Sequence, residues 1–181
     1  MAHSDAELTF PPAAEAPAGE GLIRTYRQTA GQMVRPVAVV ACLRGRQPHA
    51  ITVDSFLDVS YDPPTMAVSV YSGSRMMESL DIADAMTISV LAAEQKNIAQ
   101  WLGEPGQPLY GLLDTVPTAA APSGVPYIRG AAAVFDCRIV DRLEVATHTL
   151  VVGEVLTCAE RAGARPLARW QDGYGTATGR G

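Results

Sequence analysis

The amino-acid sequence predicts a mainly β (α+β) protein in which antiparallel strands form a barrel. The strongest observation is a pair of long alternating segments, 131–141 and 147–160, which a short polar turn separates as in an antiparallel hairpin. Several shorter strand-like runs precede this pair, whereas the predicted helices are few and short. Strands and helices do not alternate regularly, and this argues against a parallel α/β sheet.

The first twenty residues predict a separate, disordered arm. Residues 1–20 are rich in Ala, Pro and Glu, with Leu8 and Phe10 as large apolar side chains. Such a segment cannot bury enough surface to offset the entropy lost on ordering. We therefore expect a disordered arm over residues 1–20 and one folded domain over residues 21–181, beginning with a short helix from Leu22 to Met33.

The first half of the domain predicts strands with short helices between them. A continuous apolar run over residues 36–43 indicates a strand covered on both faces, and a polar turn leads from it to a second strand over residues 49–53. The elements expected next are strands over 65–71 and 87–91 and helices over 74–85 and 94–102. Residues 103–126 are rich in Pro and Gly and predict an irregular excursion.

Charge excludes several classes of protein. Fourteen Lys and Arg residues against nineteen Asp and Glu residues give a net charge of −5, and residues 1–20 hold four of the acids and no Lys or Arg. A near-neutral body without a basic run excludes an electrostatic nucleic-acid binder and a polybasic membrane anchor. The longest uncharged stretch, residues 115–128, contains three prolines and is too short to span a membrane.

The termini and cysteines indicate the compartment. The N-terminus lacks the basic and apolar regions of an export signal, so we expect a cytoplasmic protein. Cys42, Cys137 and Cys158 form no CxxC pair, and their apolar neighbours predict buried, reduced thiols. The sequence holds no HExxH, Walker, GxSxG or GxGxxG motif, and no metal site is expected.

Two polar segments are candidates for ligand binding. Residues 51–64 are either a hydroxyl-rich turn that satisfies its own backbone or a wall that offers hydroxyls and N–H groups to a flat polar ligand. Ser74 is placed to cap a helix, and the N–H groups of that first turn would suit an anion together with Arg75. Every serine-capped helix has this appearance, so the pattern alone does not establish phosphate binding.

The histidines give a weaker signal. His148 shares strand parity with Leu150, Val152 and Leu156, so its imidazole belongs either to the core or to a functional site. His49 stands beside a turn and is expected at the surface. The spacing suggests no Ser-His-Asp or Cys-His arrangement.

Between Arg24 and Tyr174 the sequence resembles the flavin reductase-like, FMN-binding split-barrel family, the reductase components of two-component flavin monooxygenases. The resemblance rests on the spacing Thr-x-x-Ser-Phe-x-x-Val-Ser-x-Asp-Pro-Pro over residues 52–64 and on His148 ahead of a Gly-Glu-Val. It implies an antiparallel Greek-key split β-barrel with a few short flanking helices. It also implies a homodimer with the flavin near the subunit interface.

The resemblance further implies an NAD(P)H:flavin oxidoreductase, with FMN (or FAD) as cofactor and NADH or NADPH as reductant. A hydride would pass from nicotinamide to flavin, and reduced flavin would reach a partner monooxygenase. The residues implied to line the flavin ring and ribityl chain are Thr52, Val53, Asp54, Ser55, Phe56 and Ser60. The remaining implied roles are phosphate binding near Ser72, Ser74 and Arg75, contact of the catalytic His148 with the nicotinamide, and approach of Tyr174 to the flavin.

The sequence departs from the family pattern at the places where ligands would bind. Asp54 and Asp58 stand where small or neutral residues are usual, and Ala146-Thr147-His148 replaces the usual Gly-Asp-His. These departures keep two alternatives open. One is a diverged non-redox catalyst or binding protein on the same barrel that acts on a bulky, apolar small molecule. The other is a flavin carrier without turnover.

Overall fold

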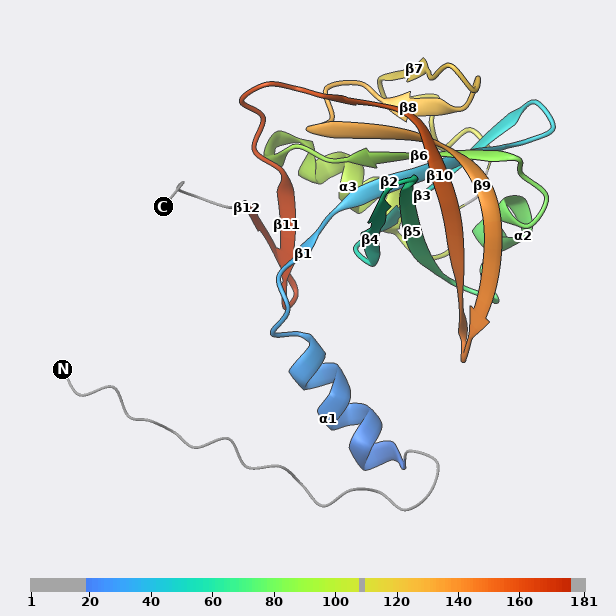
Figure 1. The fold of residues 1–181 in the computed structure, drawn as a ribbon. Helices are drawn as coiled ribbons and strands as arrows, with labels where there is room; N and C mark the ends of the chain where they lie inside the picture. Colours follow the sequence, from blue (N-terminus) through green and yellow to red (C-terminus); the bar gives the residue numbers. More distant parts are fainter. Residues whose placement is uncertain (1–18, 108–109, 177–181) are drawn as a thin grey trace. The chain divides into compact units, whose positions relative to one another are not determined.

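The structure, a computed structural model, describes residues 19–107 and 110–176 (Figure 1). The described residues fall into two units, which divide between Met33 and Val34. Residues 1–18 of the predicted disordered arm lie outside the described residues. Glu20 begins helix α1 (Glu20–Ala30), which confirms the first predicted helix with slightly earlier bounds, and none of the residues of α1 is buried. No helix in the described ranges is both long and apolar enough to cross a membrane.

The second unit is mainly β. Its strands are β1 (Arg35–Pro36), β2 (Ala38–Arg44), β3 (Gln47–Val53), β4 (Phe56–Tyr61), β5 (Pro64–Tyr71), β6 (Ala85–Val90), β7 (Thr118–Ala120), β8 (Pro126–Ile128), β9 (Ala133–Val145), β10 (His148–Glu160), β11 (Leu167–Trp170) and β12 (Gly173–Thr176). Its helices are α2 (Arg75–Leu80), the 3-10 helix η1 (Ala93–Gln95) and α3 (Lys96–Gly103). The strand pairs are antiparallel, which confirms the predicted fold class.

The order of strands determines where the edges of the large sheet meet. Seven strands follow the order β3-β2-β6-β9-β10-β5-β4, and a smaller sheet has the order β1-β11-β12. The edge strands β3 and β4 are consecutive in the chain and are joined only by Asp54 and Ser55. The Ser55 carbonyl also accepts a hydrogen bond from the Ser69 N–H of β5 at 2.8 Å. The large sheet therefore curls until its two edges come together at residues 54–55.

Strand β2 separates two apolar cores, as its continuous apolar run predicts. Alternate β2 residues face opposite sides of the sheet, so both sides of this strand are buried. One core includes Val40, Val68, Met76, Leu80, Met86 and Ile88. The other includes Val39, Leu91, Leu102, Leu113, Ile128 and Leu167.

The β9–β10 hairpin confirms the clearest sequence pattern but turns its faces differently from the expectation. The inward residues of β10 are Thr149, Val151 and Gly153, whereas His148 is exposed. Register shifts on both sides of residues 153–155 break the regular pairing with β9. The interpretation of His148 as a core residue is therefore wrong.

The turn of this hairpin contains one departure from the family pattern. Ala146 has φ of 54°, a left-handed conformation that glycine adopts most easily. The family pattern has glycine at this position, and Ala146 adopts the left-handed conformation with a side chain that is unfavourable there.

Several elements differ from the sequence-based expectation. Strand β4 occupies part of the segment expected as a polar turn or wall, β7 lies within the irregular excursion, and β8 begins at its last residue. Helix α2 ends at Leu80, before the expected residue 85, and the Arg142 guanidinium donates hydrogen bonds to the carbonyls of Leu80 and Ala83 beyond it. These contacts satisfy carbonyl groups that the short helix leaves unpaired.

The cysteines are free thiols, but only two of them are buried. Burial raises the pKa of Cys42 and of Cys137 to about 12, so both thiols stay protonated. Cys158 is exposed, and the expectation of a buried thiol is wrong for this residue.

Candidate functional site

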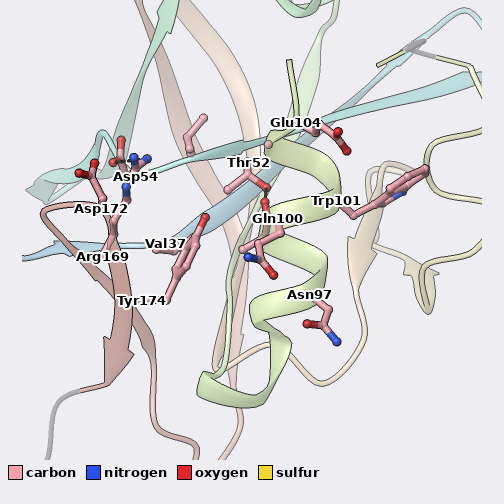
Figure 2. A pocket seen from close by; sticks show the side chains of 13 residues that line it. Val37, Thr52, Asp54, Asn97, Gln100, Trp101, Glu104, Arg169, Asp172 and Tyr174 are labelled. Atoms are coloured by element: carbon pink, nitrogen blue, oxygen red, sulfur yellow. Dashed lines mark hydrogen bonds and ion pairs between the residues drawn. The ribbon is translucent and has the colours of Figure 1, made fainter. Parts of the chain in front are cut away.

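Two pockets adjoin at the place where the sheet edges meet. Thr52, Val53 and Asp54 line both of them. The hydroxyl pocket, of about 220 Å³, is lined by Ile51, Thr52, Val53, Asp54, Ser55, Ser69, Val70, Tyr71, Ser74 and His148. The aromatic pocket, of about 670 Å³, is lined by Val37, Thr52, Val53, Asp54, Asn97, Ala99, Gln100, Trp101, Gly103, Glu104, Arg169, Asp172 and Tyr174 (Figure 2).

The hydroxyl pocket brings together His148 and the segment after β3. His148 pairs with Tyr71 across β10 and β5, and their rings lie edge to face with centroids 5.8 Å apart. The Thr147 hydroxyl lies 3.0 Å from Nδ1 of His148. In this chain a neutral hydroxyl therefore contacts the imidazole from the position where the family pattern has a carboxylate.

The three residues expected near a phosphate are not equally placed. Ser74 lines the hydroxyl pocket and caps α2, because its Oγ accepts a hydrogen bond from the Met77 N–H at 3.1 Å. The Arg75 guanidinium instead donates to the Gln107 carbonyl at 2.6 Å. The Ser72 hydroxyl lies 2.9 Å from that of Thr149. Ser74 thus lines the pocket, while Ser72 and Arg75 contact protein groups beside it.

Two further expected residues lie outside both pockets. Phe56 is partly buried and packs against the core that contains Val68. Ser60 accepts a hydrogen bond from the Asp62 N–H at 3.2 Å, within the turn that follows β4. Both belong to the predicted motif over residues 52–64, of which residues 52–55 line the pockets.

The aromatic pocket lies between helix α3 and the small sheet. Tyr174 lines it from β12, and Nζ of Lys96 lies 5.8 Å from the centre of that ring. Trp101 lines the opposite side, and its Nε1 donates to the Leu112 carbonyl at 3.0 Å. The Thr52 hydroxyl donates to the Ala99 carbonyl at 2.9 Å and joins β3 to α3. The pocket therefore combines flat side chains with polar groups held by the protein.

Asp54 carries a charge that the protein compensates. Its Oδ2 lies 3.6 Å from Nη1 of Arg35 and 3.5 Å from Nη1 of Arg169. The sequence pattern identifies neither arginine, and Arg169 lies 115 positions from Asp54 in the chain. The sequence also does not predict that α3 lines the pocket. Helical spacing indicates only that Trp101 shares an apolar face of this helix with nearby residues.

The position of His49 differs from the expectation more clearly than that of the other polar residues. It is only 1% exposed, although its place beside a turn indicated a surface residue. Its Nδ1 lies 2.6 Å from the Ser79 hydroxyl, its Nε2 has no hydrogen-bond partner among the described residues, and its ring meets Tyr110 edge to face. Burial, with a smaller contribution from the charge of Arg44, lowers the pKa of His49 below its ordinary value of 6.5.

This burial predicts acid-sensitive folding. As pH falls below about 6.5, the imidazole protonates in the unfolded chain before it does in the folded one, so the unfolded state binds more protons. The neutral His49 imidazole therefore contributes stability above that pH. This contribution is lost as the pH falls toward the lowered pKa that His49 has in the folded protein. Melting temperatures between pH 7.5 and 5 should fall less steeply for His49→Gln than for the parent. Equal slopes would contradict a neutral buried His49.

The site as a whole fits a polar ligand with a flat ring. The hydroxyl pocket supplies donors and acceptors from Thr52, Ser55 and Ser74, and the aromatic pocket supplies Trp101 and Tyr174. Pockets of this kind bind cofactors by apolar contact and orient them through a few polar groups. The hydroxyl pocket alone is small, so a ligand the size of FMN would have to extend beyond it, along the residues that the pockets share.

Comparisons with known proteins agree with this geometry. The sequence model of a family described as "Flavin reductase like domain" matches residues 30–178. The NADH-dependent FMN reductase AsuE2 of Streptomyces nodosus subsp. asukaensis is 32% identical over 154 residues, covering 83% of this chain and 83% of that protein. The NADH-dependent flavin reductase StyB of Pseudomonas fluorescens is 30% identical over 154 residues, covering 82% of this chain and 86% of that protein.

A solved structure shows the same similarity in three dimensions. BorF, the flavin reductase component of a bacterial two-component tryptophan halogenase, superimposes with a TM-score of 0.80 at 29% identity. The match covers 87% of this chain and 99% of that one.

Proposed function

Because the chain belongs to the flavin reductase-like family, we propose that it is an NAD(P)H-dependent flavin reductase acting on FMN or FAD. The observation that carries the proposal is the pair of adjoining pockets that share Thr52–Asp54. Two ligands must lie against each other for a hydride to pass between them. A flavin that spans both pockets along their common wall, with the nicotinamide against it beside His148, would meet this requirement.

The protein's own part in this reaction is to bind and orient. Flavin, when bound, supplies the redox chemistry by accepting a hydride from the nicotinamide. The hydroxyls of Thr52, Ser55 and Ser74 would hold the polar chain and phosphate of the flavin, and Tyr174 would border its ring. Hydride transfer between the two cofactors requires no side chain to donate or accept a proton.

The departures from the family pattern leave the hydroxyls and the Tyr174 ring of the two pockets in place. Asp54 is compensated by two arginines, and Asp58 lies on β4 outside both pockets. Ala146 adopts a left-handed conformation, and the Thr147 hydroxyl contacts the imidazole of the pocket. We therefore place the reductase ahead of a non-redox protein on the same scaffold.

The direct test is NADH oxidation by the purified chain with and without added FMN. We expect flavin-dependent oxidation of NADH and a yellow protein after incubation with FMN. Flavin binding without oxidation of NADH or NADPH would indicate a flavin carrier. Failure to bind FMN or FAD at millimolar concentration would overturn the proposal.

We further propose that reduced flavin passes to a separate monooxygenase and that the reaction takes place in the cytoplasm. BorF is described as the reductase component of a two-component system, which supports the first part. Free thiols at all three cysteines and the use of NADH or NADPH support the second.

A homodimer is part of the same proposal. Strand β4 and the β9–β10 hairpin carry exposed apolar side chains, namely Leu57, Val59, Val140, Leu143, Val145 and Leu156. Light scattering should give twice the 19.1 kDa mass of one chain. Leu143→Glu should shift the protein toward monomer, whereas Ile82→Glu, at an exposed apolar position after α2, should not. A parent protein of single-chain mass at micromolar concentration would contradict the dimer.

His148 is expected to position the nicotinamide. Its imidazole is exposed to the hydroxyl pocket beside Tyr71, so His148→Ala removes a contact without opening the core. We expect the KM for NADH to rise about 3–30-fold, the loss of one or two polar contacts, while FMN affinity changes less than about twofold. Loss of FMN affinity with an unchanged KM would instead place His148 against the flavin.

A further inference from the structure

Tyr71 places an exposed aromatic ring in the wall of the hydroxyl pocket. It is the last residue of β5, it is 57% exposed, and it lines this pocket but not the aromatic one. The other ring among the residues that line the hydroxyl pocket is the His148 imidazole. A flat ligand in this pocket would therefore meet the Tyr71 ring.

The neighbouring Gly73 leaves the space that this ring occupies. A Cβ added to Gly73 would stand 2.9 Å from Cε1 of Tyr71 and 3.1 Å from its Cζ and Oη, closer than the optimal separation of nonbonded atoms. Gly73 is not one of the glycines with positive φ, so its backbone shape is open to other residues. Space for the Tyr71 ring is therefore what the missing side chain at residue 73 provides.

His148 contacts the same ring from a second strand. Tyr71 and His148 are direct partners in the pairing of β5 with β10, and their rings meet edge to face with centroids 5.8 Å apart. Aromatic pairs favour this geometry. The Ser72 N–H donates to the Thr147 carbonyl at 3.0 Å, which ties the chain after Tyr71 to the residue before His148. The ring therefore has a defined position although solvent reaches it.

The proposed reaction creates a positive charge on a flat ring. Hydride transfer breaks the C4–H bond of the dihydronicotinamide and forms an N–H bond on the flavin, which is thereby reduced. Both electrons of the broken bond leave with the hydride, so the neutral dihydronicotinamide becomes a cationic pyridinium. The face of an aromatic side chain attracts a cation within about 6 Å. Such a contact favours the pyridinium, and the transition state that leads to it, over neutral NADH.

We propose that the Tyr71 ring contacts the nicotinamide and stabilises the positive charge that develops on it during hydride transfer. The inference rests on the proposed function, in which the nicotinamide lies beside His148. Tyr71 is placed for this contact because its ring meets His148 in the hydroxyl pocket, whereas Tyr174 lines the aromatic pocket. Tyr71 is then a catalytic residue that acts through its ring and not through a proton.

The first experiment measures hydride transfer in a single turnover, with FMN bound and NADH saturating. Tyr71→Leu, which removes the ring, should lower this rate about 3- to 30-fold, the loss of one cation–π contact. The inhibition constant of NAD+ should rise by a similar factor, whereas the dissociation constant of NADH should change less than about twofold. Tyr71→Phe keeps the ring and should stay within about twofold of the parent. Tyr26→Leu, at a 70% exposed tyrosine of α1 that lines neither pocket, is the matched control.

Gly73→Ala tests the position of the ring without changing its chemistry. The added methyl would displace the far end of an exposed side chain, so we expect a melting temperature close to that of the parent. The hydride-transfer rate should fall, as it does for Tyr71→Leu. Because both changes act on one contact, the double variant should lose no more than Tyr71→Leu alone. Additive losses would show that Gly73 acts elsewhere and would overturn the assignment.

Three other results would overturn the inference and leave the reductase intact. Equal losses for Tyr71→Phe and Tyr71→Leu would assign the effect to the hydroxyl group. Weaker FMN binding with unchanged hydride transfer would place Tyr71 against the flavin. A higher dissociation constant for NADH with an unchanged rate would show a contact that does not respond to the developing charge.

A parent that oxidises neither NADH nor NADPH would overturn the proposed function and leave the ring contact to be tested by itself. The probe is 1-methylnicotinamide, a permanent pyridinium cation, and its binding to the full chain is measured by calorimetry. Weaker binding to Tyr71→Leu than to the parent and to Tyr71→Phe would support the contact. Equal binding to all three would overturn it.

Discussion

Replacing Gly153 by alanine is expected to lower the free energy of unfolding by about 1–3 kcal/mol, the usual range for overpacking a close-packed core. Gly153 lies on the inward face of β10, and an added Cβ would stand 2.8 Å from Cβ of Cys137 and 2.8 Å from Cε of Met86. Met86 and Cys137 are fully buried, so neither can move into solvent. Urea unfolding followed by circular dichroism measures the change.

The matched control is Gly175→Ala on strand β12. An added Cβ there meets no atom within 4 Å, and we expect a change within about 0.5 kcal/mol, as for an ordinary surface substitution. Equal losses at the two glycines would show that backbone flexibility, and not the space beside Cys137, decides the effect. This result would also leave the glycine of the Gly-Glu-Val motif without a packing explanation.

Replacing Arg75 by alanine is expected to weaken FMN by about 1–3 kcal/mol, or roughly 5- to 150-fold, while riboflavin loses much less. The two flavins differ by the phosphate alone, so their ratio isolates a contact with that group. Arg75 follows Ser74, which lines the hydroxyl pocket, and its guanidinium already donates to the Gln107 carbonyl. Fluorescence titration with both flavins provides the measurement.

The hydrogen bond from Arg75 to the Gln107 carbonyl offers a second explanation for a loss of FMN affinity. If Arg75 acts only by holding the segment around Gln107, both flavins should lose affinity equally, and the phosphate role would be withdrawn. Arg46→Ala, at an exposed arginine in the β2–β3 turn, controls for the general loss of one positive charge. FMN affinity of that variant should match the parent.

Local periodicity was sufficient to identify most of the sheet. The continuous apolar run of β2 and the alternation of β5, β9 and β10 each depend on neighbours in the sequence, and each was confirmed. Strand β4 was missed because Asp58 and Ser60 interrupt its apolar residues, so its side chains resemble those of a turn. The inward face of β10 was misjudged because irregular pairing with β9 changes which residues point inward, and no periodic pattern records this.

In the site too, residues close together in the sequence were predictable, whereas contacts between residues far apart in the sequence were not. Thr52–Ser55 line one pocket, and the sequence singles them out together because they are consecutive and their polarity contrasts with the strands around them. The pairing of Asp54 with Arg169 depends on the small sheet folding beside β3, which local sequence does not encode. His49 was misplaced because nearness to a turn indicates exposure, whereas α2 and Tyr110 cover this residue.

On the ribosome, the first strands of this chain emerge well before they can complete their sheet. Strands β3, β2 and β6 lie on one side of the β9–β10 hairpin and strands β5 and β4 on the other. Among the described strands, the pairing of β9 with β6 and the pairing of β10 with β5 join the two parts. A nascent chain therefore carries two unfinished sheet edges, on β6 and on β5, until Ala133–Glu160 has been synthesised. Such edges pair readily with those of neighbouring chains, so slow translation before residue 133 would favour aggregation over the native sheet.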